Sequence, residues 1–299
     1  ETLSAQDLSA RLGQTGYLCD EALATVTYLA LRMQRPLLLE GEPGTGKTAL
    51  AEALAEVAGA PLIRLQCYEG IDAGQALYDW DFPRQILHLR ALEAAGALGQ
   101  GAVTDADAAE ESLFDERFLL ARPVLRALRE SPAVLLVDEI DRADDEFEAF
   151  LLELLSDFAV TVPEIGTIAA VEPPAVIVTS NRTRELHDAL KRRCLYHWIG
   201  HPSLEREIQI VRARVPGVPE RLAAEAAAFV QRLRALDLAK APGVAETIDW
   251  TQALLALGQE ELDAGVVDAT LGSVLKYHED VERVRDAGLR ELVGEVRGG

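Results

Sequence analysis

The sequence is poor in cysteine, in aromatic residues and in lysine. Its three cysteines, Cys19, Cys67 and Cys194, are odd in number and far apart in a chain of 299 residues. This usage excludes the paired framework of a small disulfide-stapled domain, so we expect reduced thiols in a cytoplasmic protein. Aromatic residues make up 5% of the chain, whereas hydrophobic residues of all kinds make up 49%. That composition suits an α/β protein built largely from alanine and leucine.

Positive charge is also in short supply. The chain has 29 Lys and Arg against 50 Asp and Glu, which gives a net charge of −21. This balance disfavours binding to nucleic acid or to an anionic membrane surface. No apolar run approaches the roughly 20 residues of a membrane-spanning helix. We therefore expect no nucleic-acid partner and no stable membrane insertion.

The start of the sequence carries no targeting signal of the secretory type. No basic stretch followed by an apolar stretch opens the sequence at Glu1. The first residue is not methionine, which is compatible with a trimmed leader.

The clearest functional motif in the sequence lies at residues 41–48. Positions 41–48 read Gly-Glu-Pro-Gly-Thr-Gly-Lys-Thr and match the phosphate-binding P-loop, G-x-x-x-x-G-K-[ST]. The apolar run at 36–40 predicts a strand before it, and the alanine-rich segment at 49–56 predicts a helix after it, as the motif requires. Glycines allow successive N–H groups to face one anion, and the helix start adds partial positive charge. The candidate nucleotide-binding residues are Gly41, Glu42, Pro43, Gly44, Thr45, Gly46, Lys47, Thr48 and Ala49.

Side chains of the motif and of a second segment supply the expected chemistry. Lys47 can reach the β- and γ-phosphates of ATP, and the Thr48 hydroxyl can ligate Mg²⁺. Residues 133–139 are five apolar residues followed by Asp138 and Glu139, the pattern of a buried parallel strand ending in two carboxylates. Asp138 can hold the Mg²⁺ shell, and Glu139 can polarise a water for attack on the γ-phosphate. An apolar strand that ends in Asp-Glu is common by itself, so the catalytic interpretation depends on the P-loop.

Further apolar runs predict the remainder of a sheet. Residues 61–67, 175–181 and 194–199 each predict a strand, and the second of these ends in the polar amide of Asn181. Alternation about a Pro/Gly turn predicts a β-hairpin over 160–168.

The later part of the chain is predicted to be helical. Residues 141–158 carry an apolar stripe at helical spacing, which predicts one helix. From Pro202 onward the chain is rich in Ala, Leu, Glu and Arg with helical periodicity. We place a domain boundary there, between residues 1–200 and residues 201–299.

With the P-loop, the Asp-Glu strand, the Asn-ended strand and an arginine pair in this order, the chain resembles an AAA+ ATPase. More narrowly it resembles the CoxD-like branch of the MoxR group, in the phrases at 64–70, 138–143, 179–186 and 242–250. The resemblance implies an α/β fold, a three-layer αβα sandwich whose parallel five-stranded sheet has the order 5-1-4-3-2. A C-terminal all-α lid would follow.

The resemblance also implies two additions to the nucleotide-binding domain. A helix-2 insertion would lie at about 84–115, and a presensor hairpin would lie at about 158–172.

The resemblance assigns further site residues and partners. Asn181 matches sensor 1, and Arg193 matches the arginine finger that enters the next subunit's site, with Arg192 as the close alternative. Without the family, the arginine pair is better read as a surface patch. The implied protein binds ATP and Mg²⁺ and forms a ring of identical subunits, a hexamer. The branch is associated with maturation of molybdenum–copper carbon monoxide dehydrogenase, which implies a metalloenzyme client and a von Willebrand A-domain partner.

One departure from the family concerns the lid. AAA+ lids usually offer a sensor 2 arginine, but the segment between Ala241 and Gly258 contains no Lys or Arg. Glu246, Thr247 and Trp250 occupy that region instead.

Two alternatives to an ATP-driven chaperone stay open. One is an ATP-switched assembly or regulatory module with little turnover, and the other is a DNA-acting AAA+ motor, which the net charge of −21 disfavours.

We predict that Lys47→Ala abolishes nucleotide binding, because the ammonium group is the side-chain cation of the phosphate-binding motif. Titration with a fluorescent ATP analogue measures the effect. Equal affinity in the variant and the wild type would contradict the P-loop assignment.

Overall fold

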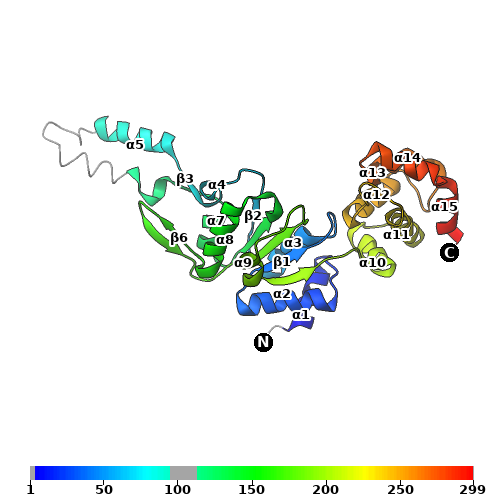
Figure 1. The fold of residues 1–299 in the computed structure, drawn as a ribbon, viewed down its shortest axis with the longest axis horizontal. Coiled ribbons are helices and arrows are strands. Elements are labelled where there is room, and N and C mark those ends of the chain that lie inside the picture. Colours follow the sequence, from blue (N-terminus) through cyan, green and yellow to red (C-terminus); the bar gives the residue numbers. More distant parts are fainter. Residues whose placement is uncertain (1–3, 95–112, 299) are drawn as a thin grey trace. The chain divides into compact units, whose positions relative to one another are not determined.

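A five-stranded sheet forms the centre of the structure, a computed structural model that describes residues 4–94 and 113–298 (Figure 1). The strand order is β2-β5-β8-β1-β9, which is the predicted order 5-1-4-3-2, and the sheet is parallel. Its strands are β1 (Leu37–Glu40), β2 (Leu62–Gln66), β5 (Val134–Asp138), β8 (Ala175–Ser180) and β9 (Leu195–Trp198). All five runs predicted from the sequence are therefore strands, each within one or two residues of its expected ends.

Continuous apolar sequence explains why β1, β5 and β8 occupy the middle of the sheet. Every residue of β1 and β5 is buried, and so is all of β8 after Ala175. A strand covered on both faces requires this uninterrupted apolar pattern. The register pairs Gln66 with Asp138 across β2 and β5, and Val137 with Val178 across β5 and β8. These pairings bring polar residues at the carboxyl ends of neighbouring strands side by side.

The chain divides into two compact units. One contains residues 1–28, 39–57 and 197–299, and the other contains residues 29–38 and 58–196. The sequence-based division into 1–200 and 201–299 cuts the chain differently and stays a prediction.

The first unit contains the helix that follows the P-loop and the helices of the C-terminal third. The helices of the C-terminal third lie together (Figure 1). They pack around a core of their own, in which the rings of Phe229 and Trp250 lie 5.4 Å apart. Its helices are α1 (Ala5–Gln14), α3 (Lys47–Ala58), α10 (Leu204–Arg214), α11 (Glu220–Arg234), α12 (Val244–Ala256), α13 (Ala264–Val274), α14 (His278–Asp286) and α15 (Leu289–Gly298); α2 (Glu21–Met33) runs through the boundary between the units.

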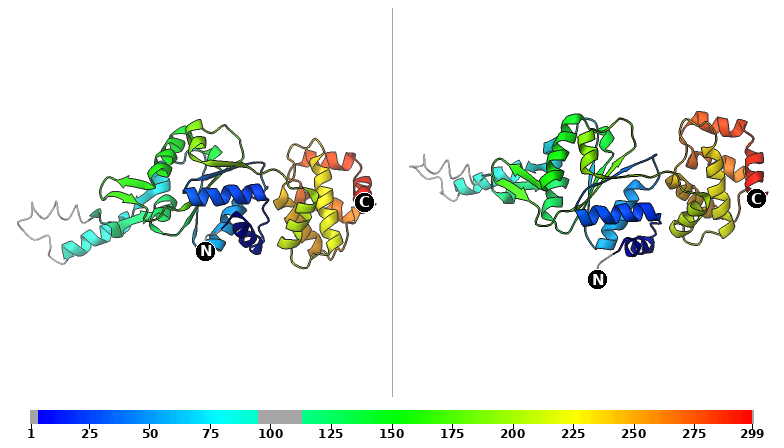
Figure 2. Two further views of the ribbon diagram at one scale, coloured as in Figure 1. Left: turned by 90° about the horizontal axis from the view of Figure 1, so that it is seen from below. Right: turned by 60° about the horizontal axis from the view of Figure 1, so that its bottom comes forward.

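The second unit surrounds β2, β5 and β8 with helices and two small antiparallel sheets (Figure 2). The hairpin of β6 (Ala159–Val162) and β7 (Gly166–Ala169) confirms the turn predicted over 160–168. A second pair, β3 (Tyr78–Trp80) with β4 (Leu119–Ala121), was not expected from the sequence. The other elements are α4 (Ala73–Leu77), α5 (Phe82–Ala94), η1 (Glu116–Phe118), α7 (Pro123–Arg129), η2 (Ile140–Arg142), α8 (Asp145–Asp157) and α9 (Asp188–Arg193).

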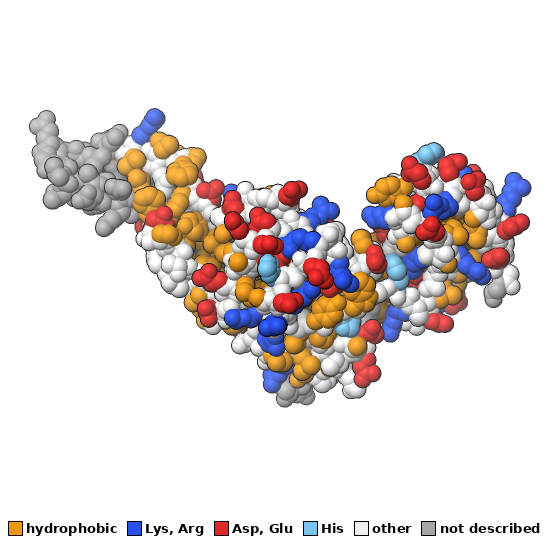
Figure 3. Space-filling view, viewed as in Figure 1, with side chains coloured by type: hydrophobic (Ala, Val, Ile, Leu, Met, Phe, Trp, Pro, Cys, Tyr) orange, Lys and Arg blue, Asp and Glu red, His pale blue; other side chains and the backbone are white. Residues whose placement is uncertain are grey.

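The predicted insertion at 84–115 lies partly outside the described residues, because residues 95–112 are not among them. Its described part is most of α5, on which Phe82, Ile86 and Leu87 are exposed. Figure 3 shows hydrophobic side chains gathered over α5. No helix in the described ranges is both long and apolar enough to cross a membrane.

The helix predicted over 141–158 is wrong at its beginning. Residues 140–142 form a 3₁₀ turn, and α8 begins only at Asp145. The side chain of Asp144 accepts a hydrogen bond from the N–H of Phe147 (2.9 Å) and so caps the helix there. Asp141 is excluded from the helix because its carboxylate bonds the loop after β8. Periodicity alone does not show where a cap interrupts a helical pattern.

We predict that Leu119→Ala lowers the free energy of unfolding by about 2–4 kcal/mol, because it leaves a cavity in a packed core. Leu119 is 8% exposed on β4, whereas its neighbour Leu120 is 45% exposed. Leu120→Ala is the matched control and is expected to change stability by less than about 0.5 kcal/mol. Urea unfolding followed by circular dichroism measures both, and equal effects would contradict the β3–β4 register.

Candidate active site

The P-loop joins the end of β1 to the start of α3. Gly44 and Gly46 adopt positive φ angles of 76° and 92°, which glycine tolerates without steric cost. The Lys47 ammonium donates to the carbonyl oxygens of Gly41 and Glu42, both at 2.7 Å. The Thr45 hydroxyl donates to the same Glu42 oxygen at 2.8 Å. These bonds close the loop upon itself and hold the ammonium inside it.

A close approach explains why the first glycine of the loop is required. A Cβ on Gly41 would collide with the carbonyl oxygen of Ile199, where the chain leaves β9. A Cβ on Gly46 would make only an ordinary contact, 3.8 Å from the ring edge of Tyr17, so glycine is favoured there by its φ of 92°. Tyr17 is buried, and burial raises the pKa of its phenol. The sequence analysis did not identify Tyr17, since an aromatic residue between two helical segments carries no signal of its own.

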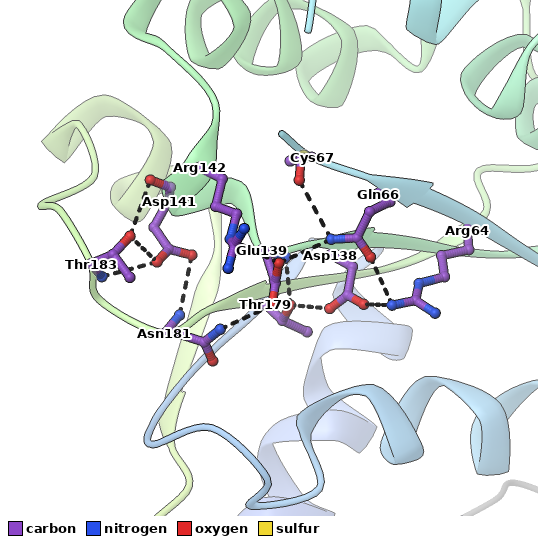
Figure 4. A network of polar contacts seen from close by, with 10 residues as sticks. All are labelled: Arg64, Gln66, Cys67, Asp138, Glu139, Asp141, Arg142, Thr179, Asn181 and Thr183. Atoms are coloured by element: carbon purple, nitrogen blue, oxygen red, sulfur yellow. Dashed lines mark hydrogen bonds and ion pairs between the residues drawn. The ribbon is translucent and has the colours of Figure 1, made fainter. Parts of the chain in front are cut away.

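In the second unit, the carboxyl ends of β2, β5 and β8 hold a network of polar side chains (Figure 4). Asp138 is 3% exposed. One of its carboxylate oxygens accepts a hydrogen bond from the Thr179 hydroxyl (2.5 Å), and the other accepts one from the Arg64 guanidinium (2.5 Å). A buried carboxylate needs such donors to replace the water that it loses. These two bonds therefore fix the Asp138 carboxylate at the end of β5.

Glu139 lies next to it in a constrained backbone conformation. Its φ and ψ are 55° and 51°, in the left-handed region that a non-glycine residue adopts only when its surroundings enforce it. Its backbone N–H donates to the Thr179 hydroxyl at 2.9 Å. This conformation turns the Glu139 side chain away from the line of β5.

The Glu139 carboxylate is held from three sides (Figure 4). One oxygen accepts from the Asn181 amide (3.3 Å). The other accepts from the Gln66 amide (3.1 Å) and lies 3.0 Å from Nε of Arg142. The structure thus brings together Glu139 and Asn181, which the sequence placed at the ends of two separate strands.

Asp141 organises the loop that carries Asn181. Its buried carboxylate accepts from the backbone N–H of Asn181 (3.1 Å), from the backbone N–H of Thr183 (2.9 Å) and from the Thr183 hydroxyl (2.6 Å). Burial raises the pKa of Asp141, but the hydrogen bonds from Thr183 and Asn181 outweigh burial, and the net pKa is lowered. Asp141 therefore stays charged and fixes the backbone at Asn181.

Arg192 and Arg193 end the short helix α9, and both are exposed. The Arg35 guanidinium donates to the carbonyl oxygens of Arg193 (3.0 Å) and Arg192 (2.7 Å), which caps this helix end. Within the described part of the chain, neither Arg192 nor Arg193 pairs its own guanidinium with a carboxylate. The two side chains therefore extend from a fixed backbone.

Several residues of the network were not assigned a role from the sequence: Arg64, Gln66, Asp141, Arg142, Thr179 and Thr183. The signal that could have identified Gln66 is its place near the end of β2, one strand from Asp138. The sequence alone does not show that β2 lies beside β5, because the two strands are about 70 residues apart. Gln66 can therefore be identified only when the strand order is known.

Comparison with known proteins gives one family match and several partial relatives. Residues 36–194 match the family model described as the AAA domain, dynein-related subfamily. The uncharacterized protein YehL of Escherichia coli is 28% identical over 198 residues, which cover 63% of this chain and 46% of YehL. The ATP-dependent zinc metalloprotease FtsH 4 of Sphaerobacter thermophilus is 26% identical over 282 residues, covering 84% of this chain and 36% of that protein. Midasin of Giardia intestinalis is 52% identical over 48 residues, which cover 16% of this chain and 1% of midasin.

Among solved structures, a mutant of RuvB from Thermotoga maritima superposes with a TM-score of 0.47 at 16% identity, covering 91% of this chain and 71% of RuvB.

The chain spans less than half the length of midasin, YehL and FtsH 4. The family model covers more than half of the chain, including the P-loop and the network around Asp138 and Glu139. The chain therefore belongs to the AAA domain family, in its dynein-related subfamily.

Proposed function

We propose that the chain is a Mg²⁺-dependent ATPase of the MoxR type that remodels or activates a protein client. The observation that carries this proposal is the contact of Glu139 with Asn181, made beside the buried carboxyl group of Asp138. A carboxylate next to a polar amide can bind and polarise a water, which is the central requirement for hydrolysis of a phosphoanhydride.

The residues present fit the nucleotide and its metal. The P-loop combines left-handed glycines with an ammonium group, Lys47, that is already held inside the loop. Such a loop suits the anionic phosphates of ATP. Thr48 and Asp138 offer hard oxygen ligands and would hold Mg²⁺, which neutralises charge on the phosphates when bound. Gly41 to Ala49 would then form the phosphate-binding segment.

The remaining side chains have roles that follow from their contacts. Glu139 accepts the proton of the attacking water, and Asn181 orients that water through its amide. Gln66 and Arg142 hold the Glu139 carboxylate in place. Arg193, or Arg192 beside it, reaches the nucleotide of a neighbouring copy and neutralises charge in the transition state. Hydrolysis then depends on assembly into a ring, for which we propose six copies.

The client and partner rest on the resemblance of the phrases at 179–186 and 242–250 to the CoxD-like branch. The client is a metalloenzyme of the molybdenum–copper carbon monoxide dehydrogenase type, and the partner is a von Willebrand A-domain protein. We assign nucleotide binding to residues 1–200 and the lid to residues 201–299, in a cytoplasmic protein. The segment at 84–115 and the hairpin at 158–172 are additions to the nucleotide-binding domain.

A second function is favoured by the restraint on Glu139. Gln66 and Arg142 occupy hydrogen-bonding positions of the proposed base, which is compatible with low turnover until a partner releases it. The chain would then act as an ATP-switched assembly module.

We predict that Glu139→Gln binds ATP with an affinity near that of the wild type but hydrolyses it at least about 100-fold more slowly, because the amide cannot accept the proton. Steady-state phosphate release and ATP titration measure the two quantities. Glu146→Gln, at an exposed position of α8, is the matched control. Near-normal turnover in Glu139→Gln would remove this residue from the mechanism.

The same variant tests the client. Tagged Glu139→Gln is incubated with Mg-ATP in native lysate and recovered, with Lys47→Ala as the control, and bound proteins are identified by mass spectrometry. Enrichment of a von Willebrand A-domain protein and a molybdenum hydroxylase subunit is expected. Strong stimulation of wild-type ATP turnover by these proteins distinguishes an ATP-driven chaperone from an assembly module, and enrichment of replication proteins instead would contradict both.

We predict that Asp141→Asn slows ATP turnover at least about tenfold with little change in ATP affinity, because an amide cannot accept all three hydrogen bonds that fix Asn181. Its cost in stability is about 2 kcal/mol at neutral pH. The folded pKa is lowered from 3.8, so the contribution of Asp141 is complete above that value and is lost as the pH falls through the folded pKa. The stability difference from the wild type should therefore shrink below about pH 4 in urea titrations.

Asp145→Asn is the control, since Asp145 is an exposed residue of α8. A turnover loss of equal size in Asp145→Asn would show that Asp141 has no special part in positioning Asn181.

A further inference from the structure

The first turn of α12 lies on the tip of the P-loop. The backbone N–H of Ala245 donates to the carbonyl oxygen of Gly44 at 3.1 Å. A Cβ on Gly243 would lie 2.7 Å from the carbonyl oxygen of Pro43 and 2.8 Å from Cα of Gly44. Both neighbours are backbone atoms that cannot rotate away, so only glycine fits at position 243. Two segments about 200 residues apart thus meet backbone to backbone.

This hydrogen bond fixes the direction of one peptide group of the loop. The peptide between Gly44 and Thr45 is trans and planar, so its C=O and N–H point in opposite directions. Because the carbonyl of Gly44 is bound by α12, the N–H of Thr45 points away from α12. A loop binds phosphate through N–H groups that are turned inward together. The contact with Ala245 removes the freedom of this peptide to flip.

The turn that makes this contact is itself held firmly. The N–H of Gly243 donates to a carboxylate oxygen of Glu246 at 2.9 Å, so the side chain at the third position of α12 reaches back to the N-cap backbone. The Arg234 side chain, 10% exposed, donates to the carbonyl oxygen of Pro242 at 2.7 Å. Arg234 also makes two bonds, at 2.6 and 2.7 Å, to the fully buried carboxylate of Glu207. A bidentate pair of this kind has a well-defined geometry.

We infer that the first turn of α12 is a positioning element for nucleotide binding, in which Gly243 and Ala245 hold the Gly44–Thr45 peptide in its phosphate-binding orientation. The lid contacts the P-loop through this backbone interaction. The segment between Ala241 and Gly258 has no cation to offer the nucleotide directly. Arg234 acts indirectly, because it binds the carbonyl oxygen of Pro242, the residue that precedes Gly243.

This inference rests on the proposed function, since it assumes that the P-loop binds ATP. It assigns no catalytic step to the lid. Its consequence is that a change in the lid, more than 100 residues from Glu139, alters nucleotide affinity through the orientation of one peptide group.

The test compares two glycine substitutions in the full-length chain. Gly243→Ala places a methyl group against the backbone of Pro43 and Gly44, whereas Gly272→Ala, on an exposed face of α13, meets nothing within 4 Å. The dissociation constant of a fluorescent ATP analogue and the kcat and KM for ATP are measured for both. We expect Gly243→Ala to weaken binding and raise KM by about five- to tenfold, the worth of one lost hydrogen bond. Gly272→Ala should stay within about twofold of the wild type.

A second pair of variants, at Glu246, tests the inference even if Gly243→Ala does not fold. Glu246→Gln keeps an acceptor for the N–H of Gly243, whereas Glu246→Ala removes it. We expect Glu246→Ala to weaken nucleotide binding and Glu246→Gln to restore most of it. Far-UV circular dichroism and thermal unfolding identify any variant whose lid has unfolded.

The outcomes separate the inference from the function on which it rests. If the wild type binds no nucleotide, the proposed function fails. If the wild type binds ATP and folded Gly243→Ala binds it as well as Gly272→Ala does, the inference is overturned. It is also overturned if Glu246→Ala and Glu246→Gln bind ATP equally, or if Gly243→Ala lowers kcat with an unchanged KM.

Discussion

Buried carboxylates need hydrogen-bond donors, and much of this structure is arranged to supply them. Desolvating an anion without partners costs far more free energy than one fold can recover elsewhere. In a chain with a net charge of −21, several carboxylates are nonetheless buried. Asp138 receives donors from β2 and β8, and Asp141 receives them from the loop after β8. Glu207 receives them from α11 and α12. Each carboxylate therefore ties its own element to others that are distant in sequence.

The same constraint connects the fold to the proposed chemistry. Because Asp138 and Asp141 must be paired, Thr179 and Asn181 are drawn to the end of β5, and Glu139 between them is forced into a left-handed backbone conformation. A residue in that conformation is held by its surroundings and has little freedom to reorient. The position of the proposed base thus follows from the hydrogen bonds made by two neighbouring carboxyl groups. Among the C-terminal helices, the Glu207–Arg234 pair has a comparable effect, because it sets the turn that meets the P-loop.

The sequence predicted those features whose signal is local. The P-loop, the five strands and the hairpin at 160–168 were all identified, since glycine spacing and runs of apolar residues act over fewer than about ten positions. The helix predicted over 141–158 was wrong at its start, because the cap at Asp144 and the long-range bonds of Asp141 overrode the periodic pattern. The β3–β4 pair was missed because two three-residue strands, about 40 positions apart, carry too little pattern to be recognised.

The local sequence identifies the chemical groups: a P-loop motif with Lys47 and Thr48, and strands that end in Asp138, Glu139 and Asn181. Which of these groups meet depends on the tertiary structure. Gln66 and Arg142 reach Glu139 through the strand order and the turn after β5, and Gly243 reaches Gly44 through the packing of α12. The physical reason is that contacts between distant segments depend on burial, register and the pairing of charge. None of these quantities is a property of a short stretch of chain.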